Sequence, residues 1–99
     1  MTSKHYQTDR QAREAIIRQI GMGQVIKSVV VDKGHINGPE IHEVTSTGIV
    51  VIYNQRTRKM ITKLIARPAQ IERYYEEGKA PEYLIKIAFE HQTKKYNKA

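Results

Sequence analysis

Apolar and polar residues recur with a helical period at the start of the chain and with a strand period in its centre. Thr8 and Gln11 resemble a capping box, so a helix is expected from Asp9 to Ile20. Gly21 and Gly23 then supply a C-terminal cap and a break. The apolar face of this predicted helix consists of Ala12, Ala15, Ile16 and Ile20.

The segment after these glycines is rich in β-branched residues and predicts a β-strand from Gln24 to Val31. Glycine, asparagine and proline between positions 33 and 39 indicate an extended loop. Three further strands are then expected, at Glu40–Thr45, Ile49–Tyr53 and Met60–Ala66. The short separations between them favour antiparallel hairpins over crossover connections.

Two prolines mark the starts of two C-terminal helices. Pro68 lies where a first helical turn would begin, and Gly78 stops the segment that follows it. Pro81 begins a last helix, which carries an apolar stripe. The two ends of the chain, residues 1–7 and 93–99, are expected to be frayed.

This order of elements predicts an α+β fold with an N-terminal helix, a four-stranded, mostly antiparallel meander sheet and two C-terminal helices. With 99 residues, the chain has room for one domain, residues 1–99, with one modest core. We expect the helices to cover one face of the sheet. The other face would then be free to be polar and functional.

The charge balance favours polyanionic partners, and nucleic acid first among them. Seventeen Lys and Arg residues stand against ten Asp and Glu, a formal net charge of +7. Residues 56–73 carry six cations and one anion, whereas residues 28–55 carry one cation and three anions. One alternative is that the cations only keep a small domain soluble. For the block 56–73 we favour a binding role.

Cysteine is absent, which excludes disulfides, thiolate chemistry and Cys-based zinc sites. The longest apolar run, Gly48–Tyr53, is too short to span a bilayer. The first seven residues lack the apolar region of a signal peptide. We therefore expect a cytoplasmic protein that does not associate with membranes.

Candidate proton-transfer groups gather around one turn. Cleavage of RNA by its own 2′-hydroxyl requires a base near that hydroxyl, an acid near the leaving oxygen and cations around the phosphate. His35 and His42 flank the Gly38-Pro39 turn, and Glu40 lies between them. The alternative is that both are ordinary loop or strand histidines. A metal site built from His35, His42 and a glutamate is a further alternative, but no HxH or HExxH spacing is present, so neither a metal ion nor another cofactor is expected.

Candidate phosphate-binding groups follow the last predicted strand. Arg67 immediately precedes a helix N-terminus, where free backbone N–H groups and the helix dipole favour an anion. Gln70 and Arg73 share the polar face of that helix. The alternative for Arg67 is a salt bridge to Glu72 or Glu43.

A second basic group lies at the turn between the last two predicted strands. Such hairpin tips commonly stay solvated; the alternative is that Arg56, Arg58 and Lys59 contact a nucleic-acid backbone. Thr62 and Lys63 are candidates for orienting and neutralising a phosphate. Because side chains alternate along a strand, these last two cannot both line one site unless a bulge intervenes.

Two stretches resemble a known family of nucleases. The run GHINGPEIHEVTSTGIVVIYN, followed by TKLIARPAQIERYY, is similar to the small phage and toxin nucleases of the barnase, EndoU, colicin and RelE superfamily. The agreement in element order covers about residues 9–91, and the agreement in motifs covers 34–75. The family shares a helix followed by a four-stranded antiparallel meander.

The resemblance implies an endoribonuclease that cleaves RNA without a metal ion. It assigns acid and base roles to His35 and His42, and to Glu40 a role as partner or alternative base. The phosphate would lie among Lys63, Arg67 and Thr62. The implied partners are RNA, either tRNA or mRNA, and an immunity protein, antitoxin or host protein. The alternative function is a non-catalytic basic module that binds nucleic acid or a host factor.

Overall fold

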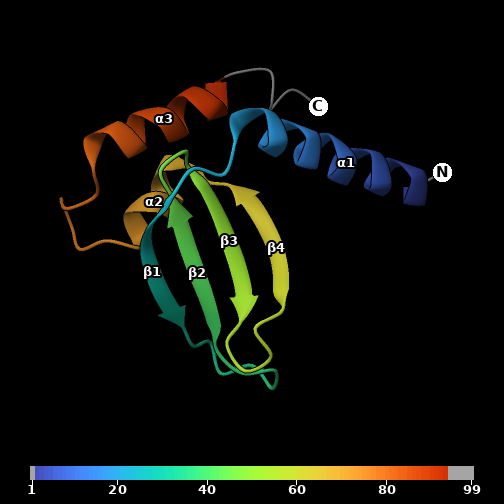
Figure 1. Ribbon diagram of the computed structural model, residues 1–99, viewed down its shortest axis with the longest axis horizontal. Helices are drawn as coiled ribbons and strands as arrows, with labels where there is room; N and C mark the ends of the chain where they lie inside the picture. The colour runs from blue at the N-terminus through green and yellow to red at the C-terminus, as the bar shows by residue number, and fades with distance from the viewer. Residues whose placement is uncertain (1, 94–99) are drawn as a thin grey trace.

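The computed structural model describes residues 2–93, and side chains from Arg10 onward, as one helix, four strands and two further helices (Figure 1). The predicted α+β fold and the order of its elements are confirmed. Met1 and residues 94–99, and with them part of the two expected frayed tails, lie outside the described residues. None of the helices in the described part is long and apolar enough to cross a membrane.

The first helix, α1 (Thr2–Ile20), is longer than predicted. It begins at Thr2 rather than at Asp9, so residues 2–7 belong to the helix and the Thr8–Gln11 pair lies inside it. Neither glycine nor proline precedes Thr8 in the sequence, so no residue there stops a helix from extending. The end at Ile20 is as predicted. Gly21, with φ 86°, donates its N–H to the Ile17 carbonyl at 2.8 Å.

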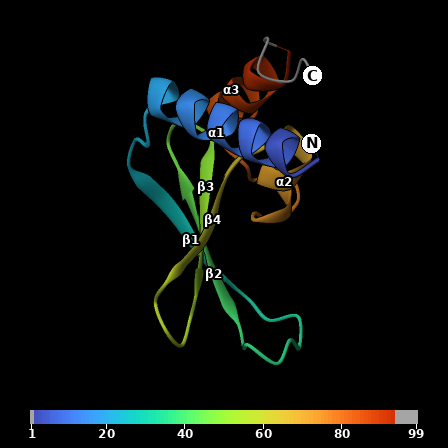
Figure 2. The ribbon, with the colours of Figure 1, turned by 90° about the vertical axis from the view of Figure 1, so that its right-hand side faces the viewer.

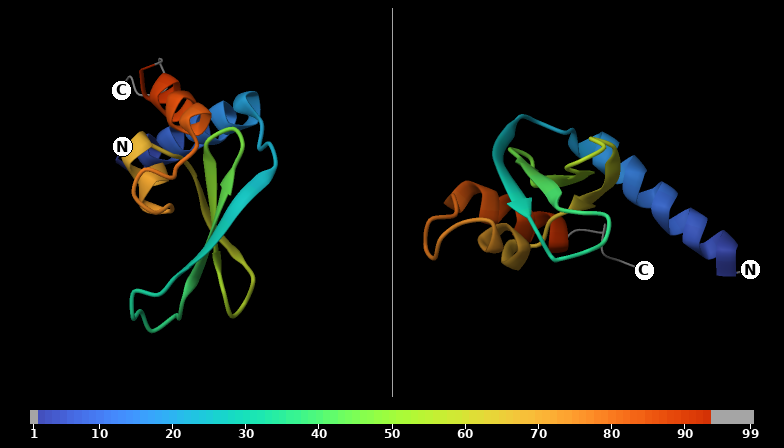
Figure 3. Two further views of the ribbon diagram at one scale, coloured as in Figure 1. Left: turned by 90° about the vertical axis from the view of Figure 1, so that its left-hand side faces the viewer. Right: turned by 90° about the horizontal axis from the view of Figure 1, so that it is seen from below.

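The sheet is an antiparallel meander in which each strand pairs with its neighbour in sequence. Its strands are β1 (Val25–Val31), β2 (Glu40–Thr45), β3 (Ile49–Asn54) and β4 (Met60–Ile65), in the order β1-β2-β3-β4. Figure 3 shows the sheet from two further sides, and β1 and β4 form its edges. A bulge in β4 makes Ile61 an extra residue between the pairs Ile52–Thr62 and Tyr53–Met60.

The register assigns each strand residue to one of two faces, because residues directly opposite one another share a face. One row on the first face, which we call the α2/α3 face, consists of Val29, His42, Ile52 and Thr62. Two rows on the second, which we call the α1 face, are Ser28, Glu43, Val51 and Lys63, and then Val30, Ile41, Tyr53 and Met60.

The main core lies between the α2/α3 face and the two C-terminal helices, α2 (Pro68–Arg73) and α3 (Glu82–Thr93). The helix α2 ends at Arg73, earlier than the predicted segment, and α3 begins at Glu82, directly after Pro81. The fully buried members of this core are Val44, Val50, Ile71, Leu84 and Ala88.

The expectation that helices cover only one face is wrong. The C-terminal part of α1 packs on the opposite face, where Ile17 forms a second buried cluster with Ile49 and Val51. The side chains of Ile49 and Val51 are apolar, so burying them under α1 removes them from water. Figure 2 shows the helices gathered at one end of the sheet. The other end, which we call the distal end, carries the loop 32–39 and the β3–β4 turn 54–59.

We expect Leu84→Ala to lower the free energy of unfolding by about 2–5 kcal/mol, because it leaves a cavity in a fully buried position. Ile36→Ala is the matched control, since Ile36 is 94% exposed in the distal loop, and its effect should stay within about 0.5 kcal/mol. Urea denaturation followed by circular dichroism measures both. Equal effects of the two substitutions would contradict this packing.

Candidate functional site

The two loops of the distal end are joined into one surface. Asn54 donates its Nδ2–H to the Asn37 carbonyl at 3.0 Å, and the Gln55 N–H donates to the Pro39 carbonyl at 3.0 Å. Gly38 has φ 92°, and a Cβ built on it would lie 2.8 Å from Nε of Arg56. The positive φ favours glycine at this position, and the Arg56 side chain passes close over it.

The β3–β4 turn is organised by one asparagine. Asn54 Oδ1 accepts the N–H groups of Arg56 and Thr57 at 2.9 and 3.0 Å, and its carbonyl accepts the Arg58 N–H at 2.9 Å. Arg58 has φ 64°, in the left-handed region that costs a residue with a Cβ about 1 kcal/mol. The sequence thus has an arginine at a position where glycine would adopt the same backbone conformation without strain. Backbone outliers of this kind cluster at functional sites.

The distal end is cationic and open to solvent. Its exposed cations are Lys33, Arg56, Arg58 and Lys59, and the exposed His35 lies in the same loop as Lys33. Of the two carboxylates here, Asp32 accepts the Gly34 N–H at 3.0 Å and Glu40 binds a histidine. None of the four cations forms an ion pair with another described residue. All four are therefore available to an anion.

His42 is buried and has both ring nitrogens occupied. The side chain is about 7% exposed, Nε2 lies 2.9 Å from Glu40 Oε1, and Nδ1 lies 2.5 Å from the Tyr74 hydroxyl. An ionised carboxylate only accepts, so Nε2 donates to Glu40, and Nδ1 shares the second hydrogen bond with the Tyr74 hydroxyl. Gln70 Nε2 donates to the same hydroxyl at 3.4 Å. We call the series Gln70–Tyr74–His42–Glu40 the polar chain.

The polar chain leads from α2 to the distal end. Glu40 is the first residue of β2, and its side chain is 25% exposed. Its carboxylate is therefore reachable from solvent, whereas the imidazole behind it is not. His42 acts on any ligand only through Glu40, which it orients. Among the described residues, no hydrogen bond or ion pair joins His35 to either of them.

The structure does not bring Thr62 and Lys63 together. Thr62 lies on the α2/α3 face in the row of His42, and its hydroxyl donates to the Lys63 carbonyl at 3.4 Å. Lys63 lies on the α1 face, in the row of Glu43. The bulge at Ile61 precedes both residues, so it does not change their alternation.

Arg67, Gln70 and Arg73 lie away from the distal end. Arg67 caps α2 with extended backbone (φ −88°, ψ 158°) at the opposite end of β4 from the turn. The six residues of β4 separate it from Lys59 by roughly 20 Å. Gln70 belongs to the polar chain, and Arg73 is exposed. No ion pair joins Arg67 to Glu72 or Glu43 among residues 10–93. The predicted phosphate-binding residues thus divide between two ends.

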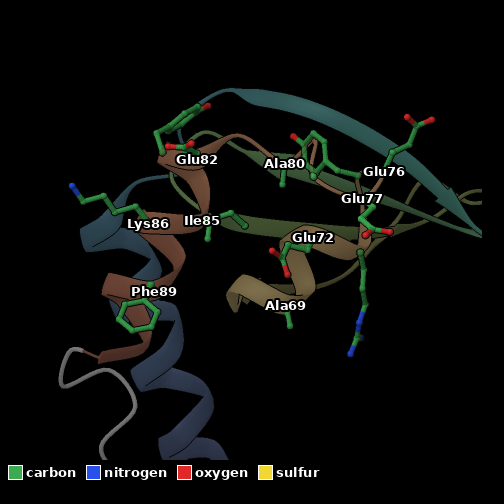
Figure 4. A pocket seen from close by; sticks show the side chains of 13 residues that line it. Ala69, Glu72, Glu76, Glu77, Ala80, Glu82, Ile85, Lys86 and Phe89 are labelled. Atoms are coloured by element: carbon green, nitrogen blue, oxygen red, sulfur yellow. The ribbon is translucent and has the colours of Figure 1, made fainter.

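An acidic groove, which the sequence did not reveal, lies between α2 and α3 (Figure 4). Its signal in the sequence is a pair of aromatic residues outside the apolar stripe of α3, Tyr83 and Phe89, which are 50% and 59% exposed. The charged residues lining it are Glu72, Arg73, Glu76, Glu77, Glu82 and Lys86. Four carboxylates against two cations make this groove unsuited to phosphate.

A second unpredicted group lies on the α1 face. Burial raises the pKa of Tyr53 above its ordinary value of 10.0, and the neighbouring Glu43 carboxylate raises this pKa further. Lys63 is two strands from Glu43 in the same row, with Val51 between them.

Within residues 10–93, no three histidine or carboxylate side chains are close enough together to hold a metal ion.

No protein-family model, curated protein or solved structure matches the chain. The resemblance to the barnase, EndoU, colicin and RelE superfamily therefore stays a prediction, and the geometry of the distal end and the polar chain must carry the functional argument.

We expect Tyr74→Phe to lower the free energy of unfolding by about 1–3 kcal/mol, because it leaves Nδ1 of a buried histidine without its hydrogen-bond partner. Tyr83→Phe removes the same atom from a half-exposed ring and should change stability by less than about 0.5 kcal/mol. Chemical denaturation of both variants measures the difference. If Tyr74→Phe left the free energy of unfolding unchanged, the polar chain would contribute nothing to stability.

Proposed function

We propose that the chain binds the phosphate backbone of nucleic acid through its distal end, with RNA as the expected ligand and the cytoplasm as its location. The observation that carries this proposal is the joining of the loop 32–39 to the turn 54–59 by Asn54, Gln55 and Gly38. It holds four exposed cations on a surface whose backbone is fixed before any ligand arrives. Such preorganisation lowers the entropic cost of binding.

The kind of cation supports a phosphate ligand. Two of the four are arginines, whose planar guanidinium groups donate paired hydrogen bonds to phosphate oxygens. The Arg56 side chain passes close to Gly38, and Arg58 is kept in the left-handed region at an energetic cost. Phosphate contacts of this type carry little sequence information, so we expect binding that tolerates different sequences.

A second candidate function, metal-independent cleavage of the bound RNA, is favoured by the partly exposed Glu40 at the same end. Oriented by His42, this carboxylate would take the proton of a ribose 2′-hydroxyl as the 2′-oxygen bonds to phosphorus. The P–O5′ bond then breaks and leaves a 2′,3′-cyclic phosphate. His35, in the cationic loop, would donate the proton to the departing 5′-oxygen. The expected immunity protein, antitoxin or host protein stays a prediction.

For binding, we expect the triple variant Arg56→Glu, Arg58→Glu and Lys59→Glu to weaken affinity for a fluorescent single-stranded RNA by at least about tenfold, because three phosphate contacts become repulsive. The slope of log affinity against log salt should become shallower by about two, at roughly 0.7 per lost contact. Fluorescence anisotropy over a series of salt concentrations measures both quantities.

The control is a triple variant with the same charge change away from the distal end: Arg18→Glu, Lys79→Glu and Lys86→Glu, all at exposed positions. It should retain most of the affinity and the original salt slope. If both triple variants lost affinity equally, binding would depend on net charge alone and the distal site would be rejected.

For cleavage, we expect Glu40→Gln to slow RNA cleavage in EDTA by about 10²–10⁴-fold, because the amide cannot accept the proton. Glu43→Gln is the matched control. Glu43 lies three residues after Glu40 in β2, on the opposite face of the sheet. The Glu43→Gln variant should therefore cleave RNA at the original rate. Denaturing gels and analysis of the 2′,3′-cyclic ends supply the readout. Binding without any cleavage by the unmodified chain would remove this candidate and leave the binding function intact.

A further inference from the structure

The strand β1 is an edge of the sheet, so only one of its sides is paired. Its inner side pairs with β2, and in the described part of the chain no strand pairs with its outer side. The left panel of Figure 3 views the molecule from this side, with β1 toward the viewer. A row of backbone N–H and C=O groups is therefore available to another strand.

The side chains of β1 are more apolar than an exposed edge requires. Its sequence is VIKSVVV, and its burial alternates along most of its length. The positions on the exposed side include Val25, Ile26 and Val30, which are 52%, 39% and 55% exposed. Five of its seven residues are β-branched, a content typical of strands that are well covered. Here one face is still uncovered.

Most of the usual protection of a sheet edge is also missing from β1. Natural edges are blunted by proline, by charged side chains, by bulges or by covering segments, and β1 has one register irregularity, between Val25 and Lys27 at its beginning. The strand has no proline, and its one charge, Lys27, folds over the ring of Tyr75, with Nζ 4.9 Å from the centroid. That contact draws the ammonium group onto the α2/α3 face and away from an incoming strand.

We propose that β1 pairs antiparallel with β1 of a second copy, about a two-fold axis at Ser28, and forms one continuous eight-stranded sheet. Ser28 is the central residue of the seven, so this register pairs all of β1 with all of its copy. It places Ser28 opposite Ser28 and Ile26 opposite Val30. The exposed apolar groups of each copy are then covered by those of the other.

The charges in and around β1 are compatible with this partner. In the same register Lys27 faces Val29, and the first charged residues after the strand, Asp32 and Lys33, face Gln24 and Gly23. No like charges are placed directly opposite one another, an arrangement that would be destabilising. A two-fold interface of this kind is self-complementary and closes at two copies, which fits a dimer rather than a fibre.

The absence of cysteine from the chain permits a direct test of the register. In the proposed pair, the two Cα atoms at position 28 lie about 4.5–5.5 Å apart, within disulfide range. Ser28→Cys should therefore form a covalent dimer under mild oxidation. Val30→Cys, whose two copies would be roughly 13 Å apart, should not. Ile36→Cys, on the exposed distal loop, reports random collisions. Equal crosslinking of the three variants would overturn the register.

Sedimentation equilibrium of the unmodified chain over a range of concentrations tests the dimer itself. We expect a monomer–dimer equilibrium that Val30→Lys weakens by more than about tenfold, because it buries a charge among apolar neighbours at two symmetric places. Phe89→Lys, in the acidic groove, should leave it unchanged. A strictly monomeric chain would refute the proposal, as would a dimer weakened by Phe89→Lys and not by Val30→Lys.

Discussion

The register between β2 and β3 is the constraint on which the rest of the structure depends. It is fixed at the β2–β3 turn, where Thr45 is 1% exposed. Its hydroxyl donates to the Ile49 carbonyl at 2.9 Å and accepts the Ile49 N–H at 3.2 Å. Gly48, with φ 85°, completes the turn under Ile87 of α3. A slip of one residue would exchange the two faces of β2. Glu40 and His42 would then leave Tyr74, and Val44 would leave the core.

With the register fixed, a chain with net charge +7 acquires two local surfaces of opposite charge. The distal end presents four exposed cations, whereas the groove between α2 and α3 is lined by more carboxylates than cations. The average charge conceals this separation. A polyanion is attracted to the exposed cations of the distal end and disfavoured at the acidic groove, so the local charge distribution influences which surface it meets.

The sequence predicted the elements well because strands and turns depend on neighbouring residues. The ends of β2 match the prediction, and those of the other strands differ by one residue at most. What it could not supply were contacts between distant segments. His42 appeared to be a catalytic partner of His35, since only seven positions separate them. Its hydrogen-bond partners are Glu40, which the sequence analysis had grouped with it, and Tyr74, from 32 residues further along the chain. The faces of β2 were also ambiguous, because each carries both apolar and charged residues.

The polar chain has a mechanical consequence. Tyr74, at the end of α2, is followed by Tyr75, which lines the acidic groove, and its hydroxyl reaches Glu40 through a single imidazole ring. Each link is a directional hydrogen bond, so the position of α2 and the orientation of the Glu40 carboxylate depend on one another. The helix that lines the acidic groove and the Glu40 carboxylate at the distal end are thus tied together by two hydrogen bonds around a single ring.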